Sequence, residues 1–68
     1  MEQIAVKGRP ETRRGDLVLI DETTGETLYA LSDPRGLLEG RLGDLVHVHG
    51  TLTETEENLP RLEITRID

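Results

Sequence analysis

Cysteine, phenylalanine and tryptophan are absent from this sequence of 68 residues, and Tyr29 is its single aromatic residue. Without cysteine, neither a disulfide nor a cysteine-based zinc site can hold the chain together. No segment contains the about 18 consecutive apolar residues that a membrane span needs. No apolar stretch follows Met1 that would act as a signal peptide. We therefore expect a cytoplasmic protein that does not enter a membrane.

Basic residues are also few, with 8 Lys and Arg against 14 Asp and Glu, for a net charge of −6. This balance disfavours non-specific binding to nucleic acid, because such binding comes mainly from neutralised phosphates. The charge is uneven, since residues 7–14 carry a net +3 and residues 15–68 a net −8. A short basic stretch of this kind is typical of a solvated loop.

The pattern of apolar residues favours a sheet. The length leaves room for one domain over 1–68, and its core must be aliphatic because Leu, Ile and Val make up most of the apolar residues. Alternation and short apolar runs between turn residues predict five strands. These expected strands are 3–7, 16–21, 26–31, 44–53 and 61–67.

The segments between the strands carry their own signals. We expect a loop over 9–15, because Pro10 cannot donate to a central ladder. A second loop, over 53–60, is acidic. Glycines inside strand patterns often mark bends or bulges, which applies to Gly8 and Gly50. Ile67 is out of phase with the earlier apolar residues of its strand, so a bulge or a strand end is expected there.

One short helix is expected between the third and fourth strands, over 34–42. Ser32 or Asp33 would cap it, and Pro34 would occupy its first turn. An apolar face would come from Leu37, Leu38 and Leu42, with Gly40 or Gly43 ending the element. The element order is then β-β-β-α-β-β.

Five strands with a helix before the fourth suit a small closed barrel, because closure removes exposed sheet edges. The chain resembles an OB-fold domain, and its first half is similar to the anticodon-binding type. The matching segments are Ile4–Gly8, Arg13–Gly15, Leu17–Asp21 with Thr24-Gly25, Leu42–Gly50, and Leu62–Ile64. An SH3-like barrel, which would not need the helix, is the alternative.

The resemblance implies a ligand surface across the second and third strands, between the loops 9–15 and 53–60. Nucleic-acid-binding OB domains place aromatic side chains there, and this chain offers only Tyr29. Single-stranded oligonucleotide binding is therefore the alternative function rather than the preferred one. Its candidate residues are Arg9, Arg13, Arg14, Tyr29 and Arg35.

The preferred function is contact with protein. Alternate residues of a strand point to opposite faces, so Val18 and Ile20 should lie outside the barrel when Leu17 and Leu19 lie inside. Together with Tyr29 or Ala30 they would form an apolar patch for a partner or a second copy, unless loops cover it. Arg13 and Arg14 would lie at its rim and pair with acids, for example Glu54 to Glu57 of a second copy.

The pair His47-x-His49 places two imidazoles on one face of a strand, roughly 6–7 Å apart. They would hold a metal ion if a neighbouring strand supplied a third ligand, for which Glu63 is the candidate. The preferred interpretation is an ordinary polar outer face, so we expect no cofactor. We also expect no enzyme activity, because no nucleophile with a base and no phosphate-binding glycine loop is present.

Overall fold

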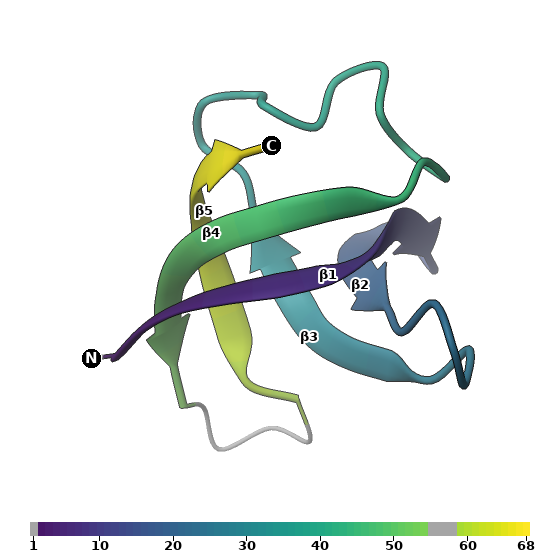
Figure 1. Cartoon of the computed structure of the whole chain (residues 1–68), viewed down its shortest axis with the longest axis horizontal. Helices are drawn as coiled ribbons and strands as arrows, with labels where there is room; N and C mark the ends of the chain where they lie inside the picture. Colours follow the sequence, from purple (N-terminus) through teal and green to yellow (C-terminus); the bar gives the residue numbers. More distant parts are fainter. Residues whose placement is uncertain (1, 55–58) are drawn as a thin grey trace.

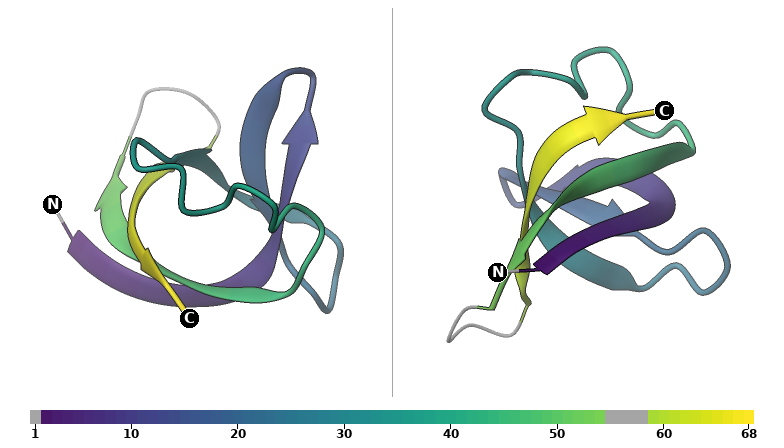
Figure 2. Two further views of the ribbon diagram at one scale, coloured as in Figure 1. Left: turned by 90° about the horizontal axis from the view of Figure 1, so that it is seen from above. Right: turned by 60° about the vertical axis from the view of Figure 1, so that its left-hand side comes forward.

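The computed structural model describes residues 2–54 and 59–68, in which five strands form one sheet that closes in a ring (Figure 1). The strands are β1 (Glu2–Arg13), β2 (Asp16–Ile20), β3 (Thr27–Ser32), β4 (Val46–Thr53) and β5 (Arg61–Ile67). Around the ring the order is β1-β2-β3-β5-β4. All neighbouring pairs are antiparallel except β3 and β5, which run parallel. Figure 2 shows the ring from above and the β1–β2 hairpin projecting from it.

The strand β1 pairs with two neighbouring strands in succession, and its pairing partner changes after Gly8. Residues 2–8 pair with β4 and residues 9–13 pair with β2. A Cβ atom on Gly8 would lie 2.7 Å from the Ile20 carbonyl oxygen and 3.0 Å from Leu19 Cγ. Only glycine lets β2 approach this closely at the corner of the ring. A Cβ on Gly50 would likewise collide with the Glu63 carbonyl, and a bulge lies beside it. The prediction that both glycines mark bends or bulges is therefore confirmed.

The prediction of a loop over 9–15 is wrong, because β1 continues to Arg13 and only Arg14 and Gly15 turn the hairpin. Pro10 lies opposite Leu19 inside the strand. Its carbonyl accepts a hydrogen bond from the Gly43 N–H at 2.8 Å, on the side away from β2. The missing Pro10 N–H therefore faces away from the β1–β2 ladder too, since both groups of one residue point the same way in an antiparallel strand.

The core fills the ring with aliphatic side chains. Its fully buried members are Leu19, Leu31, Leu38, Val46, Val48, Leu62 and Ile64. In β5, Leu62 and Ile64 follow the alternation, whereas Ile67 reaches the core from the other parity. It does so because Gly50 pairs with Ile64 and His49 with Arg66, which leaves Thr65 as an extra residue in β5. The irregularity predicted near Ile67 is confirmed.

The predicted helix over 34–42 is wrong, since the described residues between β3 and β4 form only turns. Gly36, Gly40 and Gly43 all have a positive φ, which interrupts right-handed helix within every turn. Asp33 nevertheless anchors the segment, because its carboxylate accepts hydrogen bonds from the N–H groups of Leu37 and Leu38, both at 2.9 Å. Among the described residues there is thus no helix of the length and apolar character that would cross a membrane.

This turn segment closes one end of the barrel with the buried Leu38, beside which the half-buried Leu37 also packs against the core. Leu38 is 2 % exposed and belongs to the core, whereas Leu42, four residues further on, is 53 % exposed. A helix over 34–42 would have turned both toward the core. The segment therefore acts as an irregular plug whose anchoring depends on Leu38.

Replacing Gly8 by alanine is expected to destabilise the barrel. The new methyl group meets the backbone of Ile20, which cannot rotate away as a side chain would. We expect a loss of about 1–3 kcal/mol, and each kcal/mol lowers the melting temperature by about 4–8 °C in a domain of this size. Thermal unfolding by circular dichroism measures it, with exposed Thr12→Ala on the same strand as control. Equal melting temperatures for Gly8→Ala and wild type would contradict the corner role of Gly8.

Truncating Leu38 and Leu42, two of the four leucines of the plug, should change the stability by very different amounts. Leu38→Ala leaves a cavity in the core and should lower the free energy of unfolding by about 2–5 kcal/mol. Leu42→Ala removes an exposed side chain and should change it by about 0.5 kcal/mol or less. Urea unfolding compares the two. Similar effects of both substitutions would show that the plug is not seated through Leu38.

Candidate functional site

A row of directly paired residues crosses the outer face of four strands. Glu11 of β1 lies opposite Val18 of β2, Val18 opposite Ala30 of β3, and Ala30 beside Arg61 of β5. Residues paired in this way project from the same face of a sheet. The row therefore has charged ends and a centre of one valine and one alanine.

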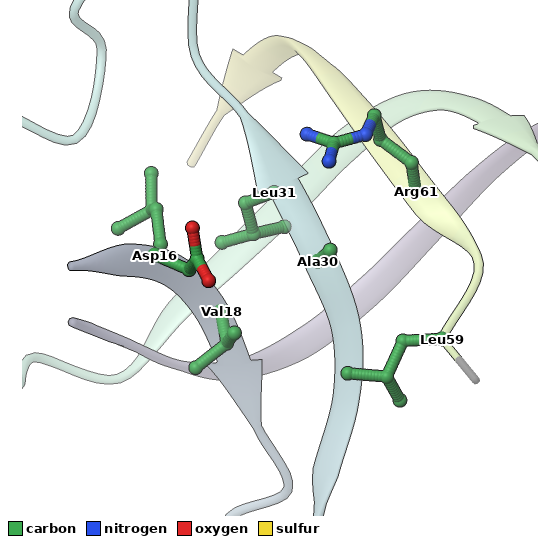
Figure 3. Close-up of a pocket in the computed structure, with 7 residues that line it drawn as sticks. Asp16, Val18, Ala30, Leu31, Leu59 and Arg61 are labelled. Atoms are coloured by element: carbon green, nitrogen blue, oxygen red, sulfur yellow. The ribbon is translucent and has the colours of Figure 1, made fainter. Parts of the chain in front are cut away.

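A hollow that Ala30 helps to line lies on this face, and we call it the β2–β3–β5 groove. It has a volume of about 630 Å³ and is lined by Asp16, Leu17, Val18, Ala30, Leu31, Leu59 and Arg61. Figure 3 shows β3 running between Asp16 and Val18 on one side and Leu59 and Arg61 on the other. This size lies within the range of about 300–1,000 Å³ that is typical of ligand sites.

The rims of the groove carry opposite charges, from Asp16 on β2 and Arg61 on β5. Both residues are exposed. Across residues 2–54 and 59–68 neither one takes part in an ion pair. The guanidinium and the carboxylate therefore face solvent over an apolar floor, each able to pair with a charge on a bound molecule.

The predicted exposed patch of Val18 and Ile20 is wrong, because each is only 6 % exposed. Both do lie on the face opposite to Leu19, as the alternation predicts, but that face is covered at these two positions. Val18 is paired with Glu11 and Ala30, and Ile20 with Arg9 and Thr27. Val18 still contributes to the groove. A second copy or partner would therefore meet the groove rather than a broad apolar surface.

Tyr29 is half-buried and packs against the core, opposite Leu19. The sequence left open whether Tyr29 or Ala30 faces outward, and the pairing of Val18 with Ala30 decides for Ala30. The single aromatic ring of the chain is thus turned away from the outer face of β2 and β3. This placement removes the only candidate for base stacking on that face.

The arginines predicted as nucleic-acid or interface residues do not form one cluster. Arg9 and Arg13 lie on β1 and Arg14 turns the hairpin, whereas Arg35 belongs to the segment between β3 and β4. Arg13 is also paired with Glu11, with 3.1 Å between Nη2 and Oε1. Of the acids predicted to meet Arg13 and Arg14 in a second copy, Glu54 is exposed, and residues 55–58 lie outside the described residues.

A second group of polar side chains gathers on the outer face of β4 and β5. His47, His49 and Asp68 offer ligand atoms that all lie within 4.8 Å of one another. Glu63, the third ligand predicted from the sequence, is not in this group and lies opposite Thr51. The sequence missed Asp68 because its position depends on the extra residue Thr65 in β5.

The acid of this group is held by contacts with both histidines. Asp68 Oδ2 lies 2.8 Å from His49 Nε2, and the Asp68 backbone N–H donates to the His47 carbonyl at 2.9 Å. The hydrogen bond with His49 is the largest cause that holds the pKa of the Asp68 carboxyl below its ordinary value, and the charge of Arg66 acts in the same direction.

Comparison of this chain with protein-family models, with curated proteins and with solved structures finds no match. The function therefore has to be argued from the two outer-face sites themselves.

The lowered pKa of Asp68 gives a pH test. His49→Ala should move the Asp68 pKa upward, toward its ordinary value, because the main stabilising hydrogen bond to the carboxylate is lost. A carboxyl pKa that is lower in the folded than in the unfolded state stabilises the fold above the unfolded-state pKa. That contribution disappears as the pH falls through the folded-state pKa.

Carbon-detected NMR titration of the Asp68 side chain measures this pKa change directly. The control is Thr51→Ala, which lies on β4 like His49. An unchanged Asp68 pKa in His49→Ala would contradict the assigned cause. In unfolding experiments, the stability difference between wild type and His49→Ala should shrink as the medium becomes more acidic.

Proposed function

We propose that this chain is a non-enzymatic OB-fold module that binds a segment of a partner protein in the β2–β3–β5 groove. The fold assignment is supported by the order of the strands. β1, β2 and β3 are joined by hairpins, and β4 returns after a long connection to lie beside β1. This is Greek-key order, and the OB-fold is a five-stranded Greek-key barrel.

The absence of a helix in the described residues weakens one reason for preferring the OB-fold over an SH3-like barrel. The strand order takes its place as the reason. In this proposal the plug over residues 33–45, with Leu38 in the core, occupies the position in the chain where the resemblance implied a helix. The resemblance of the first half to the anticodon-binding type stays a prediction from the sequence.

The observation that carries the binding proposal is the groove itself. Among its apolar lining residues, the half-buried Leu17, Ala30 and Leu59 offer a surface to one side chain of a partner. On its two rims Asp16 and Arg61 offer charges of opposite sign. The occupant that fits is an extended segment with an aliphatic residue between a basic and an acidic residue. Opposite charges at the rims select its orientation and sequence more than its affinity.

A nucleic-acid strand fits this groove less well. It would find no aromatic ring on the described outer face of β2 and β3, since Tyr29 packs against the core. It would also bring phosphates toward Asp16 and Glu11, in a chain of net charge −6. The three arginines of the β1–β2 hairpin would offset this repulsion of phosphates only in part, because Arg13 already pairs with Glu11. Base stacking, worth about 1–3 kcal/mol per base, would be missing.

The test selects short peptides from a random library displayed on phage and measures the affinity of the enriched peptides by fluorescence anisotropy. We expect the enriched sequences to place an aliphatic residue between opposite charges. Ala30→Leu fills the groove and should weaken binding about ten-fold or more. The matched control is Ala5→Leu, an exposed position on β1 outside the groove, which should bind like wild type.

Charge reversal provides the second arm. Arg61→Glu should weaken the same peptides, whereas Arg41→Glu, an exposed arginine that does not line the groove, should leave them unaffected. Undiminished binding by Ala30→Leu, or no enrichment at all, would overturn the proposal. Salt-sensitive binding of a mixed-sequence 15-mer of single-stranded DNA would favour the nucleic-acid alternative instead. A dimer that Ala30→Leu dissociates would identify the occupant as a second copy.

A further inference from the structure

The cluster on the outer face of β4 and β5 lies apart from the groove, and none of its three residues lines that hollow. We propose that His47, His49 and Asp68 bind a divalent transition-metal ion of the zinc class. Two imidazoles and one carboxylate, with the remaining positions taken by water, form a donor set that zinc accepts readily.

The bulge at Thr65 is what assembles this donor set. With a regular register, Gly50 opposite Ile64 would place Thr65 beside His49 and Ile67 beside His47. Because Thr65 is extra, Arg66 lies opposite His49 and Ile67 opposite Val48. The next residue, Asp68, then donates its backbone N–H to the His47 carbonyl at 2.9 Å. A one-residue offset reverses the faces of a strand, so Asp68 joins the histidines on the outer side.

The three side chains lie near one another, and a modest contraction would bring them around one ion. The two imidazole rings have centroids 4.9 Å apart, and the ligand atoms of all three residues lie within 4.8 Å. Ligand bonds of about 2.0–2.2 Å require donor atoms about 3.4 Å apart around a tetrahedral ion. Side-chain rotation alone supplies the remaining contraction, because each backbone is held in or beside the β4–β5 ladder.

His49 Nε2 is the ring nitrogen that faces the Asp68 carboxylate, where a metal ion would bind. It lies 2.8 Å from Asp68 Oδ2, and a carboxylate only accepts, so we assign Nε2 as the donor. For Nε2 to bind the ion, the neutral ring has to carry its proton on Nδ1 instead, and Nε2 and Oδ2 then turn toward the metal.

Arg66 is the built-in competitor of the ion. Its Nη2 lies 3.2 Å from His49 Nε2 and its Nε lies 3.6 Å from Asp68 Oδ1, so a positive charge already occupies the space beside the ligands. The Arg66 side chain is 65 % exposed and can turn into solvent. Two kinds of substitution should therefore change the metal affinity in opposite directions. Removing the arginine should strengthen metal binding, whereas removing any ligand should weaken it.

The experiment titrates the full chain, free of any affinity tag, with Zn²⁺ by isothermal titration calorimetry and with Co²⁺ by visible absorption. The chain has two histidines and no cysteine, so every imidazole signal in a proton NMR spectrum comes from this site. Both imidazole resonances of wild type should move on addition of Zn²⁺. The melting temperature should increase with the Zn²⁺ concentration, since the ion binds only the folded chain.

Substitutions decide the assignment. His47→Ala, His49→Ala and Asp68→Asn should each weaken binding by more than the about 10–100-fold that loss of an outer-shell partner costs. Arg66→Gln should tighten binding. Glu63→Gln removes a carboxylate from β5, the strand that precedes Asp68, and should leave the zinc affinity unchanged. This control distinguishes Asp68 from Glu63, the third ligand that the sequence suggested.

Two outcomes would overturn the proposal. One is an absence of Zn²⁺ and Co²⁺ binding to wild type at millimolar metal, in which case the cluster is only an ion pair on a polar face. The other is an affinity that Asp68→Asn leaves unchanged and Glu63→Gln abolishes. Because neither Asp68 nor the histidines line the groove, both results leave peptide binding by the β2–β3–β5 groove unaffected.

Discussion

The closure of the ring depends on one backbone contact, the approach of β2 to β1 at Gly8. At this residue β1 leaves β4 and joins β2, and the Ile20 carbonyl and the Leu19 side chain occupy the space where a Cβ would be. A strand that has two successive neighbours must bend sharply between them. Residues 2–8 of β1 thereby hold β4 on one side of the corner, and residues 9–13 hold β2 on the other.

That direction also determines which side chains meet on the outside. Each directly paired set of residues shares a face, so the register carries Glu11, Val18, Ala30 and Arg61 into one row. Three members of this row, Val18, Ala30 and Arg61, line the groove. Neither the row nor its hollow belongs to any single strand, and both sites of the molecule combine residues that are distant in the sequence.

The sequence was sufficient for features that depend on one strand at a time. The alternation in β2 correctly separated Leu19 from Val18, and the phase of Ile67 correctly indicated an irregularity in β5. Features that depend on neighbours were not predictable in the same way. Pro10 fits in β1 because residues 9–13 of that strand pair with β2 alone, and Ile20 is buried although it lies on the face opposite to Leu19. Helix propensity between β3 and β4 was overestimated because three glycines adopt a positive φ.

The extra residue Thr65 links the inside of the barrel with its surface. The same offset that turns Ile67 into the core carries Arg66 and Asp68 out to the histidines. A slip of β5 by one residue would therefore withdraw an isoleucine from the interior and break up the outer cluster in one event. The arrangement of the outer cluster therefore persists as long as the core packing around Ile67 persists. Opening of the cluster by backbone motion should be as rare as local unfolding of the β4–β5 pair, while its side chains stay free to rotate.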